Sequence, residues 1–214
     1  MNYAIIGAGG FAIELYGYIM EKRRFGADIE FAGFCANCDR AESLDKYGLA
    51  RLYLGNYETI ELSSDLAFLI AIGQPRVRKT VYESFKALGR TMPNFTAHGC
   101  RVNETALERA EGNIFCPGSG GYFYKIGDGN LFNLYTALAH DTEIGSFNAL
   151  SSYCDITGHC KMGDFNFFGS RAAMLPSAEI GDGNKISAGS VVYKGCKDNT
   201  IMHGNPARSV GFAE

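Results

Sequence analysis

The fold is decided by residues 126–192, which read IGDGNLFNLYTALAHDTEIGSFNALSSYCDITGHCKMGDFNFFGSRAAMLPSAEIGDGNKISAGSVV. Every sixth residue in this stretch is apolar. These positions are Ile126, Phe132, Leu138, Ile144, Leu150, Ile156, Met162, Phe168, Met174, Ile180, Ile186 and Val192. In a chain with 46% hydrophobic residues, twelve such positions in succession arise by chance about once in ten thousand trials. A period of six cannot hold one face of an α-helix, so it indicates a different repeating structure.

A second position of the repeat, four residues after the apolar one, always carries a small side chain. It holds Asn130, Thr136, Thr142, Asn148, Cys154, Cys160, Asn166, Ala172, Ala178, Asn184, Ser190 and Cys196. Two inward positions in six residues describe a parallel β-helix, in which three hexapeptides make one triangular coil. The three cysteines are then core residues. Glycines that directly follow the apolar residue (127, 145, 163, 169 and 181) are expected to supply corner backbone angles that other residues resist.

The first hundred residues have a different pattern, in which strands alternate with helices. Apolar strands are predicted over residues 3–6, 29–35, 66–72 and 91–96, and helices after residue 10 and over 74–88. The predicted buried faces of the two helices are Ile13, Tyr16, Ile19 and Met20, and Val77, Val81, Phe85 and Leu88. Such alternation predicts a small Rossmann-like α/β sheet. We therefore expect a Rossmann-like domain over residues 1–98 and a β-helix over 99–214.

Composition excludes several classes of function. The chain has 20 Lys+Arg and 23 Asp+Glu, and this net charge of -3 gives no field that would attract nucleic acid. No apolar run is long enough for a membrane span, and the N-terminus does not resemble a signal sequence. Seven cysteines without a disulfide-scaffold spacing indicate a cytoplasmic protein. Cys35 and Cys38 form one CxxC without a second pair, so we expect two free thiols and no metal site.

A glycine-rich loop follows the first predicted strand. Residues 7–12 read GAGGFA and fit G-x-G-x-x-A, a turn whose backbone N–H groups approach a phosphate at a helix N-terminus. A dinucleotide would also need an acidic residue at the end of the second strand, where Cys35 and Ala36 stand instead. Dinucleotide binding, a plain turn without a ligand, and binding of a nucleotide-sugar diphosphate all stay open. The last is the best functional interpretation.

Four stretches together resemble a known family. They are IIGAGGFA, FLIAIGQPRVRK, ALAHDTEIGSFNALSSYCDITGHCKMGD and GNPARSVG. The hexapeptide array resembles the left-handed β-helix acyltransferases, and its combination with a Rossmann-like domain resembles the PglD/NeuD family of bacterial sugar O- and N-acetyltransferases. The resemblance implies acetyl-CoA as acyl donor, no metal, a homotrimer, and a role in polysaccharide or glycan biosynthesis.

The resemblance also implies the catalytic residues. In the stretch AHDTEIG, His140 corresponds to the family's general base and Asp141 to the carboxylate that orients it. An imidazole suits this role because an amine or hydroxyl that attacks a thioester must lose a proton near neutral pH. The backbone N–H of Gly158 corresponds to the family's oxyanion donor. His159, eighteen residues after Asp141, either lines the thioester channel or is a surface residue, and His98 and His203 are interpreted as structural.

Further residues are implied for the two substrates. Contacts to acetyl-CoA are expected at Ser170, Ala188, Arg208 and Asn148, with Arg208 near the CoA phosphates. Contacts to the acceptor are expected at Gly9, Gly10, Phe11, Gly73 and Arg78. Three features depart from the family. Phe11 replaces a loop histidine, Ala149 replaces a histidine near the cofactor, and Cys35 and Ala36 replace acids that would contact a nucleotide. A UDP-sugar, another nucleotide sugar and a free sugar acid therefore all stay open.

Hypotheses of two different classes follow. The first is an acetyl-CoA-dependent acetyltransferase acting on the amine or hydroxyl of a sugar, with N-acetylation of a nucleotide-linked amino sugar favoured. The alternative is a non-catalytic trimeric β-helix scaffold or sugar-nucleotide-binding protein. A serine or antibiotic acetyltransferase of the β-helix class is a third possibility, which the Rossmann-like domain disfavours.

Overall fold

The computed structural model describes residues 1–38 and 41–213. The chain divides into two compact units: residues 1–73 with 77–93, and residues 74–76 with the chain from 94 onward. Within the described residues, no helix has both the length and the apolar character needed to cross a bilayer.

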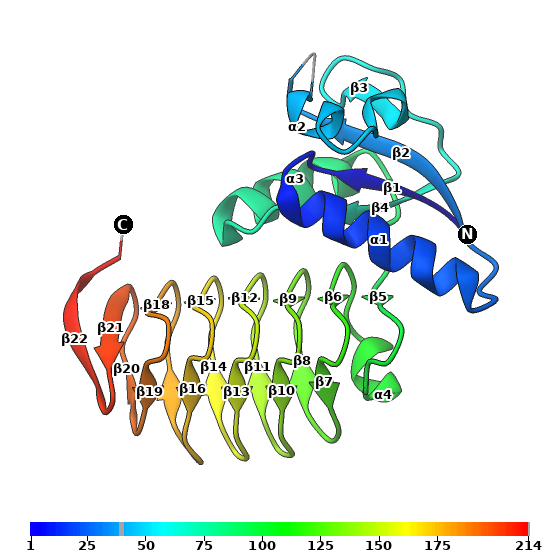
Figure 1. The fold of residues 1–214 in the computed structure, drawn as a ribbon. Helices are drawn as coiled ribbons and strands as arrows, with labels where there is room; N and C mark the ends of the chain where they lie inside the picture. Colours follow the sequence, from blue (N-terminus) through cyan, green and yellow to red (C-terminus); the bar gives the residue numbers. More distant parts are fainter. Residues whose placement is uncertain (39–40, 214) are drawn as a thin grey trace. The chain divides into compact units, whose positions relative to one another are not determined.

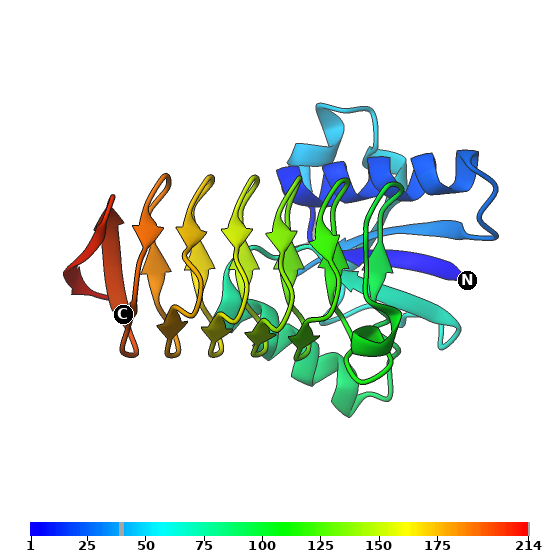
Figure 2. The same ribbon diagram turned by 90° about the horizontal axis from the view of Figure 1, so that it is seen from below.

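The first unit is a four-stranded parallel sheet with helices on both faces. Its strands are β1 (Asn2–Ile6), β2 (Glu30–Ala36), β3 (Tyr53–Asn56) and β4 (Leu66–Ile70), in the order β3-β2-β1-β4. Its helices are α1 (Gly10–Arg24), α2 (Glu42–Asp45), the 3-10 turn Ala50–Leu52, and α3 (Pro75–Ala87). Figure 2 shows α1 and α3 on opposite sides of the sheet. Because both faces are covered, β4 is apolar and buried along its whole length.

The observed elements correct several of the sequence predictions for this unit. Strand β3 was not predicted, because YLGN is short and half-exposed. The strand predicted over 91–96 does not form: Thr91 makes a single bridge to Ala67, and only Phe95–Thr96 is a strand, β5, which belongs to the second unit.

The predicted helix faces are also partly wrong. Helix α1 buries Ala12, Leu15 and Ile19, so its buried stripe is rotated from the predicted one. Predicted members Ile13, Tyr16 and Met20 are only half-buried. In α3, Val81 and Phe85 are buried, and Phe85 meets Phe68 of β4 with ring centroids 4.9 Å apart, whereas Val77 and Leu88 are exposed.

The second unit is a stack of coils built from two-residue strands (Figure 1). Most of these strands pair in parallel with the strand three places further along the chain, so the coils have three flat sides. One side is β19 (Val191–Val192), β16 (Ala173–Met174), β13 (Asp155–Ile156), β10 (Ala137–Leu138) and β7 (Gly120–Gly121). The second is β20 (Gly195–Cys196), β17 (Glu179–Ile180), β14 (Lys161–Met162), β11 (Glu143–Ile144) and β8 (Lys125–Ile126). The third is β22 (Ala207–Phe212), β21 (Thr200–Gly204), β18 (Lys185–Ile186), β15 (Phe167–Phe168), β12 (Ala149–Leu150), β9 (Leu131–Phe132), β6 (Ile114–Phe115) and β5. Helix α4 (Glu104–Leu107) precedes β6.

The inward positions predicted from the repeat are confirmed. Every apolar residue of the six-residue series is buried except Ile126, which is half-buried, and each ends its two-residue strand. The small positions are buried too, apart from the half-buried Cys196. Burial raises the pKa of the Cys154 thiol to about 12, so this cysteine is an inert core residue, as predicted.

The glycines of the repeat serve a different purpose from the predicted one. The left-handed backbone at the corners falls mainly on other residues, three places after each apolar position. These are Tyr135, Asp141, Phe147, Tyr153, His159, Phe165, Arg171 and Ser177, with φ between 56° and 66°. Gly127, Gly145, Gly163, Gly169 and Gly181 are not among the residues with positive φ. The expectation that they provide unusual corner angles is therefore wrong.

Four of these glycines (127, 145, 163 and 181) instead make room for a ladder of side-chain caps, whereas Gly169 makes room for the backbone of Ala188. A Cβ on Gly163 would lie 2.0 Å from Oδ1 of Asp182, and one on Gly145 would lie 2.2 Å from Oδ1 of Asp164. Those oxygens accept hydrogen bonds from the backbone of the preceding coil, Asp182 from the N–H of Asp164 (2.7 Å) and Asp164 from that of Ser146 (2.6 Å). Glycine is thus needed so that each coil can cap the one before it.

We expect Gly163→Ala to lower the free energy of unfolding by about 1–3 kcal/mol, because the new methyl group displaces the Asp182 cap and overpacks the corner. The matched control is Gly17→Ala in helix α1, where nothing lies within 4 Å of the added Cβ. That change should stabilise the chain by about 0.5–1 kcal/mol, because alanine favours a helix. Urea unfolding followed by circular dichroism measures both. Equal effects of the two variants would contradict the steric role of Gly163.

Candidate active site

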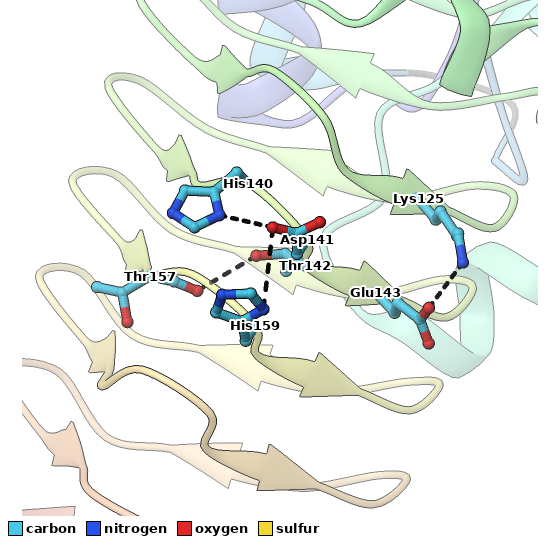
Figure 3. Close-up of polar contacts among 7 residues, drawn as sticks. All are labelled: Lys125, His140, Asp141, Thr142, Glu143, Thr157 and His159. Carbon is cyan, nitrogen blue, oxygen red and sulfur yellow. Dashed lines mark hydrogen bonds and ion pairs between the residues drawn. The ribbon is translucent and has the colours of Figure 1, made fainter.

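His140 and Asp141 lie at one corner of the coil, between β10 and β11 (Figure 3). The left-handed backbone at Asp141, with φ of 59°, turns its carboxylate back toward the preceding side chain. Nδ1 of His140 lies 2.7 Å from Oδ2 of Asp141. When Nδ1 carries the proton and donates it to the carboxylate, Nε2 is left with a free lone pair. This hydrogen bond is the main cause that lowers the pKa of Asp141, so Asp141 is a carboxylate at neutral pH.

Gly158 occupies the equivalent position on the next coil, eighteen residues on. A Cβ there would lie 3.0 Å from both Cε1 and Nε2 of His140, so the imidazole packs edge-on against the glycine. Among the described residues, 1–38 and 41–213, nothing accepts a hydrogen bond from the Gly158 N–H. At the corner of the coil where the aspartate caps lie, by contrast, the corresponding N–H groups of Ser146 and Asp164 donate to aspartate side chains. Gly158 therefore combines close approach to Nε2 with an available donor.

His159 joins this cluster, a role that the sequence left undecided. It lies directly beyond Asp141 on the next coil, and its N–H donates to the carbonyl of His140 (3.1 Å). Its Nδ1 is 3.9 Å from Oδ2 of Asp141, and the two imidazole rings are nearly perpendicular with centroids 5.1 Å apart. The eighteen-residue interval between Asp141 and His159 was the signal for this proximity. One carboxylate thus faces two imidazoles.

The strand that follows the cluster carries an ion pair. Nζ of Lys125 on β8 lies 2.8 Å from Oε1 of Glu143 on β11 (Figure 3). Lys125 also contributes, after the two histidines, to lowering the pKa of Asp141. The coils beneath are joined by the hydroxyl of Thr142, which donates to the carbonyl of Thr157 (3.2 Å). The backbone under the cluster is therefore hydrogen-bonded from coil to coil, although the side chains of the cluster are about 60% exposed.

Three of the four residues expected to contact the cofactor are exposed. Ser170 and Ala188 are exposed at the same corner of successive coils, where Gly169 allows the backbone of Ala188 to come within 2.5 Å of its Cβ position. Arg208 is exposed on β22 and lines a cavity of about 780 Å³ together with Tyr193, Lys194 and Lys197. This cavity lies at the C-terminal end of the stack.

Two of the predicted site residues, Asn148 and Arg78, are buried instead of accessible to a ligand. Asn148 is fully buried, its Nδ2 bonds to Asn130 Oδ1 (3.0 Å), and its Oδ1 accepts from the N–H of Asn166 (2.8 Å), so no atom of its side chain is left for a ligand. Arg78 is also buried, and its guanidinium donates to the carbonyls of Ile72 and Gly73 at 2.7 and 3.2 Å. Burial lowers the pKa of Arg78 to about 9. Arg78 therefore stabilises the loop after β4 instead of presenting its guanidinium to a phosphate.

The glycine loop of the first unit lies where two neighbouring strands end. Gly7 follows β1, and a Cβ on it would lie 3.0 Å from the carbonyl of Ala71, just after β4. Gly9 and Gly10 are exposed at the start of α1, Gly73 is exposed, and Phe11 is half-buried. The loop thus leaves backbone groups accessible at the carboxyl edge of the sheet, at the point where strand order reverses.

Comparison with known proteins first defines the class of fold. No family model matches the chain. No curated protein matches it either. Solved structures do match over nearly the whole chain, and they include an acetyltransferase domain and a GDP-perosamine N-acetyltransferase. The chain shares the fold of these structures.

Three particular structures illustrate the match. The acetyltransferase domain of PglB from Neisseria gonorrhoeae has a TM-score of 0.81 and 21% identity, covering 98% of this chain and 99% of that one. WeeI from Acinetobacter baumannii has a TM-score of 0.83 and 21% identity, covering 98% and 100%. PerB from Caulobacter crescentus, in complex with CoA and GDP-perosamine, has a TM-score of 0.79 and 22% identity, covering 99% and 98%. That enzyme, a GDP-perosamine N-acetyltransferase, has also been solved with one histidine replaced by asparagine or alanine.

Proposed function

We propose that the protein is an acetyl-CoA-dependent acetyltransferase that acylates a sugar, with the amine of a nucleotide-linked amino sugar as the favoured acceptor. The observation that carries the proposal is the pair of His140 and Asp141, with Nδ1 and Oδ2 2.7 Å apart, beside Gly158, whose N–H has no acceptor within residues 1–38 and 41–213. An acyl transfer needs a base and an oxyanion donor next to each other. The fold shared with an acetyltransferase domain and with a GDP-perosamine N-acetyltransferase supports the same reaction.

The proposed mechanism follows from these positions. Nε2 of His140 takes the proton from the acceptor amine or hydroxyl as its heteroatom bonds to the thioester carbonyl carbon. The negative charge that develops on the carbonyl oxygen accepts a hydrogen bond from the Gly158 N–H. Asp141 holds the proton on Nδ1 and stabilises the imidazolium. When the carbon–sulfur bond breaks, the thiolate of CoA leaves and takes the proton from Nε2, which restores the base.

The donor is proposed to lie along the coils. Ser170 and Ala188 present small exposed side chains on successive coils, which leave space for a pantetheine arm. Arg208, beside Lys194 and Lys197 in the C-terminal cavity, carries the charge that CoA phosphates need. This arrangement includes a homotrimer, with donors held between neighbouring left-handed β-helices. We place the enzyme in the cytoplasm, since all seven cysteines are free thiols.

The acceptor is proposed to bind the first unit, which we interpret as a Rossmann-like domain from its strand order β3-β2-β1-β4. Gly9, Gly10 and Gly73 expose backbone groups at the carboxyl edge, and Phe11 borders them. Arg78 is not part of this proposal, because its guanidinium is buried on the carbonyls of Ile72 and Gly73. The diphosphate would therefore rest on backbone N–H groups at the start of α1.

The direct test is acetyl transfer from acetyl-CoA, followed by release of the CoA thiol. A panel of UDP-, dTDP-, GDP- and CMP-linked amino sugars, with a free sugar acid as a further acceptor, is first screened by thermal shift with acetyl-CoA present. A ligand that binds the folded protein raises its melting temperature. Transfer to at least one acceptor supports the proposal. Sugar binding without any binding of CoA in calorimetry would instead favour a non-catalytic sugar-nucleotide-binding scaffold.

We expect Asp141→Asn to lower kcat at least about 100-fold, because asparagine removes the charge that stabilises the imidazolium. Asparagine tolerates the left-handed backbone found at position 141, so the corner keeps its shape. In the native protein the lowered pKa of Asp141 keeps it ionised at and above mildly acidic pH, so its own protonation should leave no step in the rate there. Initial rates between pH 5.5 and 8.5 check both expectations. A native rate for Asp141→Asn would remove Asp141 from the mechanism.

A further inference from the structure

The cluster of His140, Asp141 and His159 has more ligating atoms than a base and its orienting carboxylate require. One nitrogen of each imidazole and one carboxylate oxygen all lie within 4.8 Å of one another. The carboxylate oxygen Oδ2 stands between the two nitrogens, at 2.7 Å from Nδ1 of His140 and 3.9 Å from Nδ1 of His159. Ligands of a tetrahedral zinc ion are separated by about 3.3 Å, given bonds of about 2.0–2.1 Å. The two printed separations differ from this value by about 0.6 Å each, and the third is at most 4.8 Å, so rotations of these exposed side chains that move the atoms by about 1 Å bring them around one ion.

The backbone holds the three ligands in register. Asp141 and His159 occupy the same corner of adjacent coils, with φ of 59° and 62°. The N–H of His159 bonds to the carbonyl of His140, and Asp141 bonds to the carbonyl of Phe123 on the previous coil (2.7 Å). Because these bonds belong to the stack itself, little backbone ordering would remain to be done when an ion binds.

The chemistry of the ligand set selects the ion. Two imidazoles with one carboxylate suit Zn²⁺ and its neighbours among the transition metals, whereas Mg²⁺ and Ca²⁺ prefer oxygen ligands alone. The side chains are about 60% exposed, so an ion would have access from solvent. Three protein ligands leave a fourth position open.

We propose that His140, Asp141 and His159 bind Zn²⁺ reversibly and that this ion inhibits the enzyme. A metal on Nδ1 of His140 displaces the proton from that nitrogen, and the neutral imidazole then carries it on Nε2. Nε2 has no lone pair left for the acceptor proton, so the base is switched off. The inhibitory part of this inference rests on the proposed function, while the binding part stands on the three ligands alone.

The test is competition of untagged protein with a chromophoric zinc indicator. We expect one Zn²⁺ per chain, at least about tenfold weaker binding in His159→Ala, and no competition by Mg²⁺ or Ca²⁺. His203→Ala is the matched control, since His203 is an exposed histidine on β21, and it should bind as the native chain does. Cys38→Ser tests the exposed thiol as a rival ligand. Circular dichroism verifies that His159→Ala is folded.

The outcomes separate this inference from the proposed function. Zinc affinity that is the same in His159→Ala, or lost in Cys38→Ser, would overturn the site. Zinc binding that depends on His159 in a chain without acetyl transfer upholds the site and overturns only the function. If the chain transfers acetyl, Zn²⁺ should inhibit it, a chelator should restore the rate, and His159→Ala should need more zinc for the same inhibition. Transfer that is indifferent to bound zinc would contradict the inhibitory role.

Discussion

We expect His140→Asn to lower kcat for acetyl transfer about 10²–10⁴-fold, the typical contribution of a general base. Asparagine has no nitrogen that accepts a proton at neutral pH, and it fills less of the space against Gly158. Because the lost interaction acts on the proton in the transition state, the KM for acetyl-CoA should change little. Initial rates at saturating acetyl-CoA, with calorimetry of CoA binding, measure the two effects separately.

The control for this variant is His203→Asn, which replaces an exposed histidine of β21. It should retain the native rate. Turnover by His140→Asn near the native level would contradict the assignment of His140 as the base, whether or not the chain binds a sugar. Loss of CoA binding together with the rate would indicate that the substitution disturbs this corner of the coil. Circular dichroism, and CoA binding by Asp141→Asn, would check for such a disturbance.

We expect Phe168→Ala to lower the free energy of unfolding by about 3–5 kcal/mol, the cost of a large cavity in a packed core. Phe168 is fully buried and pairs in register with Leu150 on one side and Ile186 on the other. The coil turns tightly, so the neighbouring backbone has little freedom to collapse into the void.

The matched control is the adjacent residue of the same strand. Phe167 is 41% exposed, so Phe167→Ala should have an effect nearer to that of a surface change, about 0.5 kcal/mol. Urea unfolding of both variants, with the signal of the coils followed by circular dichroism, gives the comparison. Similar losses for the two phenylalanines would mean that the alternation of inward and outward residues does not govern stability here.

The sequence predicts the β-helix because one rule repeats. Each coil solves the same packing problem, so the inward series from Phe132 to Val192 is detectable as periodicity without any long-range information. The first unit has no such redundancy. Strand β3 is recognised only through its pairing with β2, and the buried face of α1 depends on how the helix lies against the sheet. These are tertiary facts that local patterns do not contain.

The candidate site could be predicted only where its contacts are local in the sequence or follow from the repeat. His140 and Asp141 are neighbours in sequence, so their contact needs only a corner with a suitable backbone. His159 is a neighbour through the coil, and the eighteen-residue interval was visible, but its distance to Asp141 depends on two side-chain rotamers. Asn148 illustrates the opposite case. Its place in the small inward series already indicated burial, and that signal outweighs the resemblance that suggested a cofactor contact.

Arg78 could not be placed in advance. A basic residue near the start of a helix is equally compatible with a phosphate or with nearby carbonyl groups. The choice depends on whether the loop at Ile72 and Gly73 folds back over it. The role of the repeat glycines was hidden for a similar reason, because the crowding comes from the next coil and not from the glycine's own backbone.

The regular coil also fixes the distances along the second unit in equal steps. Each coil adds one strand spacing, about 4.8 Å, to the length of the stack. Strand β10, just before His140, is three such steps from β19, which is about 14 Å. The distance from His140 to the cations at the C-terminal end, Lys194, Lys197 and Arg208, therefore changes only in whole steps. Under the proposed function, adding or deleting one whole coil beyond β13 would change the length of acyl carrier that fits while leaving His140, Asp141 and Gly158 untouched.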